Sequence, residues 1–394
     1  MTDPQRYFRL SLFYFVYFAM LGAYAPYFAL YLQELGYSAV QIGVLLALVP
    51  VTRALFPALW AWLADHQGQR RALVRWATAG ATAASAGLLL GTDFAWLFGV
   101  LLVLNAFWCG ALPLVEASTF GHLRGRLGDY GRIRVWGSVS FVAVVALLGP
   151  LFDWAGIALL PWTLLLLFAA MAAAGWLLPA DRDAPHPAEH VPLTRLLQRP
   201  EVVVLFAACF FMALAHGPYS AFYSIHLVQH GYSKTALGAL WALSVIAEMA
   251  VFLAMPHILR RWSIPGVMGF SLLCAVARFL IIGWAVQWWL PIAFAQVLHA
   301  ATFGAHHAAA LAAIHHFFQG RYQARGQALY SAFGFGAGGA VGMFASGWLW
   351  THLGPGLTFA CGSAAALAAY LLVSARLRLP APREQPGRAS EVVP

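Results

Sequence analysis

Charged residues are scarce in this sequence: they make up 9% of its 394 residues, whereas 62% are hydrophobic. A soluble domain carries about 25% charged residues, so this chain has too little polar surface for a water-facing exterior. The apolar residues instead form long stretches separated by short polar breaks. A helix that spans a bilayer needs roughly 20 apolar residues, and the sequence therefore predicts an all-α polytopic membrane protein.

Patterns typical of disulfides, metal sites and enzymes are also missing. The four cysteines, Cys109, Cys209, Cys274 and Cys361, lie singly in different apolar stretches, which gives no reason to expect a disulfide. The histidines lack a carboxylate at ligand spacing, so we expect no metal and no other cofactor. A phosphate-binding loop and a nucleophile elbow are absent as well, which disfavours a membrane enzyme. These missing patterns do not exclude a receptor or a scaffold protein.

Twelve apolar stretches predict twelve transmembrane helices. They lie near 7–32, 38–64, 72–91, 95–121, 134–153, 157–178, 201–229, 233–258, 265–285, 289–318, 326–351 and 355–376.

The loops between these stretches differ in charge from one side to the other. One set carries arginines such as Arg70, Arg71, Arg132 and Arg325; the other set carries Glu34, Asp93, Asp153 and Lys234. Arginine and lysine mark the cytoplasmic side, so we expect both termini in the cytoplasm and the chain in a bacterial inner membrane. Because the net charge of +9 is spread over loops, it does not indicate a nucleic-acid partner.

The chain contains an internal repeat. A shift of 195 residues lays Gly36-Tyr37-Ser38 over Gly231-Tyr232-Ser233, and Gly22 over Gly217. An even number of helices per copy gives a parallel repeat, as in transporters with two six-helix halves. We therefore expect a six-helix bundle over 1–179, a cytoplasmic linker over 180–200, a second six-helix bundle over 201–378, and a disordered cytoplasmic tail over 379–394.

Four charged residues fall near the middle of predicted helices: Arg53, Glu116, Glu248 and Arg278. Each costs about 3 kcal/mol or more near the bilayer centre, so they face the protein interior, pair, or line a wet cavity. Arg53 and Glu248 occupy equivalent positions of the repeat. They form either an ion pair that fixes helix register or a substrate and proton site at the midplane, and the architecture favours the second interpretation.

Histidines and aromatic residues accompany these charges. His216 precedes Gly217-Pro218, where a helix can break, and His299 and His306 are spaced for one helix face, with His307 adjacent. Each imidazole is either a proton relay or a core histidine bonded to a carbonyl. We expect the cavity to be lined by Tyr24, Asn105, Tyr219 and Trp241 as well.

The segment Leu63 to Arg71 resembles the cytoplasmic loop signature of the major facilitator superfamily. Asp65, Gly68, Arg70 and Arg71 match it, whereas Ala61, His66 and Gln69 depart from it. The resemblance implies the major facilitator fold of two six-helix bundles. It also implies a gating role for Asp65, Arg70 and Arg71, to which we add Asp129 and Arg132 of the next basic loop.

The segment Asp129 to Ser138 contains a G-R-x-R-x-W-G stretch. It resembles the group of oligosaccharide–proton, nucleoside–proton and 3-phenylpropionate permeases. The resemblance implies that Glu116 pairs with Arg134 and that Arg278 and His299 belong to the site. Thr302 stands where the oligosaccharide branch has its proton-coupling Glu. We therefore expect Glu248, with His216 or His299, to carry the proton.

The arginines favour an anionic substrate, because a guanidinium gives a carboxylate two parallel hydrogen bonds. Together with the aromatic residues, these arginines predict a transporter that takes up a small aromatic carboxylate with a proton. We expect it to act as a monomer in the bilayer. Two alternatives remain. One is a nucleoside or oligosaccharide symporter, and the other is an efflux antiporter, whose sequence motif the Gly149-Pro150 segment matches in part.

Overall fold

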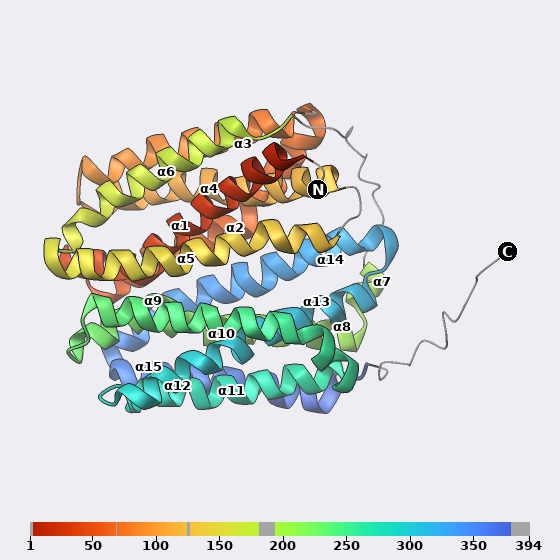
Figure 1. Ribbon diagram of the computed structural model, residues 1–394. Helices are drawn as coiled ribbons and strands as arrows, with labels where there is room; N and C mark the ends of the chain where they lie inside the picture. Colours follow the sequence, from red (N-terminus) through yellow and green to blue (C-terminus); the bar gives the residue numbers. More distant parts are fainter. Residues whose placement is uncertain (1–2, 68, 124–126, 181–193, 380–394) are drawn as a thin grey trace.

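The computed structural model describes residues 3–67, 69–123, 127–180 and 194–379, and within these ranges it contains helices and no strand. Figure 1 shows two stacked groups of helices, with the first and the last described residues on the same side of the bundle. We call α1 to α6 the N-terminal half and α8 to α15 the C-terminal half. This all-helical arrangement confirms the predicted fold class.

The N-terminal half consists of six long helices. They are α1 (Pro4–Glu34), α2 (Ala39–Gln67), α3 (Arg70–Ala86), α4 (Phe94–Leu123), α5 (Leu127–Ala155) and α6 (Leu160–Leu177), with 3₁₀ turns at Gly87–Leu89 and Ile157–Leu159.

The C-terminal half is more interrupted. It contains α8 (Pro200–Ala215), α9 (Gly217–Gln229), α10 (Lys234–Arg261), α11 (Ile264–Trp284), α12 (Trp289–His299), α13 (His306–Phe317), α14 (Gln323–Tyr330) and α15 (Gly339–Arg376). Two π-helical segments, η3 (Ala300–Ala305) and η5 (Ser331–Gly338), join α12 to α13 and α14 to α15, and a 3₁₀ turn lies at Gly320–Tyr322.

The described residues contain ten helices that are long and apolar enough to cross a membrane. Helix α3 falls short of that length with 17 residues. The last candidate, 325–376, has 52 residues, which is roughly 78 Å of helix and more than two bilayer crossings need. It is broken at Gly354, whose φ of 78° and ψ of 173° are not helical. Counting α3 and the two sides of Gly354 separately gives twelve helices among the described residues, but only ten meet the length and hydropathy of a span, so the count of twelve spans stays a prediction.

The two repeat copies form the same turn. Gly36 and Gly231 have φ of 83° and 86°, a conformation that glycine adopts without strain. The next residues, Tyr37 and Tyr232, each donate a backbone hydrogen bond to the carbonyl five residues earlier, that of Leu32 or Leu227, at 3.3 and 3.2 Å, as in a helix C-cap. Ser233 then caps α10 by accepting from the Ala236 N–H at 3.0 Å. The two turns that the repeat aligns therefore have the same conformation.

The predicted linker and tail are only partly described. Residues 181–193 and 380–394 lie outside the described ranges, and α7 (Thr194–Leu197) is a short helix within the predicted linker.

The halves meet where α2 packs on α15 and where α5 packs on α10. Glycines make both approaches close: Gly43 faces the backbone of Met343 and Gly347, and Gly149 faces the backbone of Lys234. These contacts lie toward the end of the bundle opposite the termini, so the halves are held together at that end.

Candidate functional site

The site in the C-terminal half begins at a helix break. Helix α8 ends at Ala215 and α9 begins at Gly217, with Pro218 in its first turn. Proline has no N–H to continue a helix, which explains the break. His216 lies at the junction, and its Nδ1 donates to the Met212 carbonyl at 2.8 Å. The sequence prediction of a break here is confirmed.

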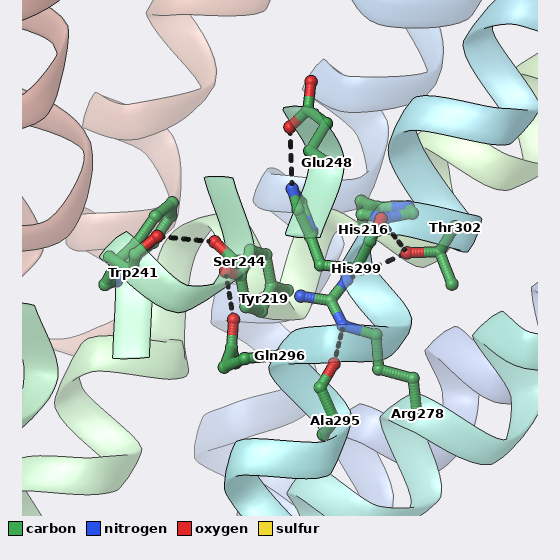
Figure 2. A network of polar contacts seen from close by, with 10 residues as sticks. All are labelled: His216, Tyr219, Trp241, Ser244, Glu248, Arg278, Ala295, Gln296, His299 and Thr302. Atoms are coloured by element: carbon green, nitrogen blue, oxygen red, sulfur yellow. Dashed lines mark hydrogen bonds and ion pairs between the residues drawn. The ribbon is translucent and has the colours of Figure 1, made fainter. Parts of the chain in front are cut away.

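Arg278 of α11 is fully buried beside this break (Figure 2). Its Nε donates to the Ala295 carbonyl at 3.0 Å, and its Nη1 donates to the Thr302 hydroxyl at 3.2 Å. The guanidinium lies 4.1 Å from the centre of the Tyr219 ring, an attractive cation–π geometry. Arg278 therefore holds three helices together by hydrogen bonds and ring contacts, not by an ion pair with a described carboxylate.

The arrangement fixes the tautomer of His216. Its Nε2 faces the Arg278 Nη1 at 3.4 Å, while its Nδ1 is occupied by a carbonyl. A guanidinium only donates hydrogen bonds, so the Nε2 accepts and the ring is neutral. With both ring nitrogens engaged in this way, His216 is less suited to carry a transported proton than the neighbouring His299.

Glu248 of α10 pairs with His299 of α12. Their Oε2 and Nε2 atoms are 3.7 Å apart, and the side chains are 18% and 10% exposed, respectively. The His299 ring also lies beside Tyr219, with centroids 5.6 Å apart, and Tyr219 contacts Trp241 with centroids at 5.2 Å. The Glu248–His299 pair is thus partly accessible and surrounded by aromatic rings.

The π-helical segment η3 changes which histidines share a face. His299 stacks on Phe303, and Phe303 stacks on His307, with interplanar angles of 8° and 13°. His306 turns instead to α11, where its Nδ1 is 3.0 Å from the Ser271 hydroxyl. The expectation that His306 lies on the same helix face as His299 was wrong. A π turn takes more residues than an α turn, so the residues after it are rotated around the helix axis.

The N-terminal half contributes cations that lie over aromatic rings. The Arg53 guanidinium is 5.5 Å from the Trp108 ring centre, and Trp108 contacts Tyr24 with centroids at 5.6 Å. Asn105 is buried, and its Nδ2 donates to the Leu101 carbonyl of its own helix. Tyr24 therefore lies near Arg53 through Trp108, and Asn105 lies three residues from Trp108 on the same helix.

Two expected ion pairs are not formed. Glu116 accepts a hydrogen bond from the Tyr130 hydroxyl at 3.1 Å, while the Arg134 guanidinium lies 3.7 Å from the Phe18 ring centre. Glu248 is paired with His299, and among the described residues Arg53 makes no ion pair with it. In each case a nearer polar group, a tyrosine or a histidine, takes the place of the expected arginine.

The predicted gating residues are spread over the end of the bundle near the termini. The Asp65 side chain lies outside the described residues, and Asp129 stands in the first turn of α5. Arg71 donates to the Trp176 carbonyl at 3.3 Å, and the carbonyl of the exposed Arg132 accepts from the Tyr7 hydroxyl at 3.0 Å. Arg70 lines a groove between α2 and α4. That these residues together form one gate stays a prediction.

Sequence reasoning missed two residues of the site and the role of Asp153 outside it. Gln296 accepts from the Tyr219 hydroxyl at 3.1 Å, Trp108 supports Arg53, and Asp153 joins the halves. Gln296 and Trp108 lie three residues from His299 and Asn105, a spacing that puts them on the same helix faces. That spacing was the available signal for both.

This geometry defines a class of protein. Long apolar helices in two repeated halves surround partly exposed charges in the middle of the spans, as expected of a membrane transporter with a central site.

The comparisons with known proteins agree. The chain matches the MFS_1 like family over residues 7–361. It is 31% identical over 357 residues to the probable 3-phenylpropionic acid transporter of Escherichia coli (strain K12), a match covering 88% of this chain and 92% of that protein. A maltose permease of Geobacillus stearothermophilus is 26% identical over 332 residues, which is 83% of each chain. The crystal structure of nucleoside transporter NupG aligns with a TM-score of 0.80 at 15% identity, covering 96% of this chain and 100% of that one.

The chain therefore belongs to the MFS_1 like family and is a transporter of the major facilitator superfamily. These relatives are membrane transporters, which confirms the prediction that the protein is not an enzyme.

Proposed function

We propose that this transporter takes up a small aromatic carboxylate together with a proton, by alternating access of its two halves. The observation that carries the proposal is that Arg53 and Arg134 have no carboxylate partner among the described residues. Each is partly exposed and lies over an aromatic ring. Cations inside a membrane protein need an anion to offset their desolvation, and a substrate carboxylate provides one.

The surroundings of both arginines suit an aromatic ring in the substrate. Trp108 contacts Tyr17 and Tyr24, with ring centroids 5.9 and 5.6 Å apart, and Phe18 lies under Arg134. Aromatic pairs contribute beyond the area that they bury. The E. coli relative is named a probable 3-phenylpropionic acid transporter, and that acid combines a carboxylate with one aromatic ring.

The C-terminal half supplies the proton carrier. Glu248 is partly exposed and paired with His299, and the charge of Arg134 acts on its carboxyl group from the other half. Protonated Glu248 accompanies the loaded carrier. In the empty carrier Glu248 is ionised, and Arg134 replaces Arg53 as the cation that we expect to neutralise it during the return step.

The proposal also covers the membrane in which the protein lies, its topology and its oligomeric state. The arginine-rich loops support a topology with both termini in the cytoplasm, and the proposal includes a monomer in the bacterial inner membrane. Small-molecule substrate, protons and lipid are its partners.

Uptake of radiolabelled 3-phenylpropionate into proteoliposomes with an imposed pH gradient tests the proposal. We expect accumulation that competing aromatic carboxylates suppress and that maltose and nucleosides do not. Arg53→Gln and Arg134→Gln abolish it, whereas Arg9→Gln, an exposed arginine at the start of α1, leaves it intact. Suppression by a nucleoside or by maltose instead of aromatic acids contradicts the proposed substrate class.

A further inference from the structure

A column of three rings runs along the inside of the C-terminal half. His299, Phe303 and His307 stack with centroid separations of 5.4 and 6.3 Å. In an α-helix, side chains four residues apart drift by about 40° per step. The π turn of η3 offsets this drift, so that His307 follows His299 in line. Interruptions of this type occur frequently at functional sites.

The far end of the column is hydrogen-bonded to another helix. The Nδ1 of His307 is 2.9 Å from the hydroxyl of Tyr330, the last residue of α14 before the second π segment. Tyr330 is buried, whereas His307 is only half-buried. The titratable groups beside this pair are His306 on α13 and Cys209 of α8, which lies next to Tyr330. The pair therefore connects a buried hydroxyl to a partly accessible imidazole.

The same helix continues toward the end of the bundle that carries the termini. His315 is exposed there, and its Nε2 is 2.9 Å from the Gln327 amide of α14. His299, His307 and His315 are spaced at equal intervals along the chain, roughly 12 Å each at the rise of an α-helix. Such a gap is too long for direct transfer between imidazoles, and water molecules bridge it in the path that we infer.

At its inner end the column begins at the contact between His299 and Glu248. The Nε2 of His299 faces Glu248, while its buried Nδ1 has no hydrogen-bond partner. Glu248 lies directly against η3: a Cβ on Gly304 is 3.1 Å from the Glu248 Cγ. The carboxylate and the first imidazole of the column are therefore held together by the π segment itself.

We propose that His307, held by Tyr330, relays protons between the Glu248–His299 pair and the water at the end of the bundle near the termini. The relay rests on the proposed proton coupling. An imidazole accepts a proton on one ring nitrogen and releases one from the other, which leaves His307 neutral in the opposite tautomer; reorientation of the ring then restores the first tautomer before the next transfer. The Tyr330 hydroxyl keeps the ring oriented and exchanges hydrogen-bond roles with it.

The test separates proton movement from substrate movement. Exchange of labelled for unlabelled 3-phenylpropionate at equal pH needs no net proton transfer, whereas accumulation driven by a pH gradient does. We expect His307→Gln and Tyr330→Phe to slow driven accumulation, and acidification inside the vesicles, about tenfold or more. Exchange stays near the wild-type rate. The matched control is His316→Gln, which removes an exposed imidazole from the same helix.

Two results overturn the relay. If His307→Gln and Tyr330→Phe accumulate substrate as fast as wild type, the proton takes another route. If both lose exchange and driven accumulation equally, the pair has a structural role only. Failure of the proposed function is distinct from either, because then the wild-type protein itself shows no proton-driven accumulation.

Discussion

Asp153, in the last turn of α5, caps a helix of the opposite half by accepting hydrogen bonds from Thr235. The backbone N–H of Thr235 donates to the carboxylate at 2.9 Å, and the Thr235 hydroxyl donates at 2.6 Å. The backbone N–H of Lys234 adds a third hydrogen bond at 2.9 Å. A carboxylate at a helix N-terminus satisfies N–H groups that have no partner within the helix. Because the cap spans the two halves, it must break whenever this end of the transporter opens.

Asp153→Ala therefore loosens the closed end opposite the termini. Loss of an N-cap costs about 1 kcal/mol, which changes a two-state equilibrium about fivefold. The measurement uses Val145→Cys, a buried residue whose backbone carbonyl faces Gly238 of the other half, in a chain whose native cysteines are replaced by alanine. A membrane-impermeant maleimide labels this cysteine about fivefold faster in the Asp153→Ala variant.

Asp93→Ala is the matched control for this experiment. Asp93 accepts from the Ala95 N–H at 2.9 Å and thus caps α4 within its own half. Its loss leaves labelling at Val145→Cys unchanged. Equal acceleration by both variants shows that the Asp153 cap stabilises the fold and does not hold the halves together.

Arg278 is expected to matter for folding as well as transport. Arg278→Gln removes a fully buried guanidinium that bonds to Ala295 and Thr302, and each group left unsatisfied costs about 1–3 kcal/mol. The variant therefore unfolds at a lower temperature in detergent, as followed by tryptophan fluorescence. Arg134→Gln, which replaces a partly exposed arginine, shifts the midpoint much less. Similar midpoints for the two variants exclude a structural role for Arg278.

Gly304 is required for the position of Glu248. Gly304→Ala places a Cβ 3.1 Å from the Glu248 Cγ, so the carboxylate moves relative to His299. We expect slower proton-driven uptake with a changed pH profile. Gly99→Ala on α4 is the control, since nothing lies within 4 Å of its added Cβ, and it stabilises the helix by up to about 1 kcal/mol. An unchanged pH profile for Gly304→Ala contradicts the role assigned to the π segment.

The elements of the fold could be predicted because their causes are local. Apolar runs define the spans, glycines at Gly36 and Gly231 define equivalent turns, and Pro218 explains the break after His216. The contacts of the site could not be predicted in the same way. Glu116 has both Tyr130 and Arg134 within one helical turn of each other on α5, and the sequence does not show which one it contacts.

The π segments also prevented prediction of the site contacts from the sequence. Regular α-helical spacing puts His306 on the face of His299, but the π turn of η3 brings His307 there instead. A π turn depends on packing against neighbouring helices more than on residue type, and it leaves no regular pattern in the sequence.

The central claim is that Glu248 carries the coupled proton, and the Glu248→Gln variant tests it most directly. Glutamine keeps the size of the side chain and removes its titration. The measurement is accumulation of 3-phenylpropionate against its gradient under an imposed pH difference, with Glu34→Gln, an exposed carboxylate near the closed end, as control. We predict that Glu248→Gln exchanges substrate but does not concentrate it, whereas Glu34→Gln behaves as wild type. Accumulation by Glu248→Gln to the wild-type level contradicts the account.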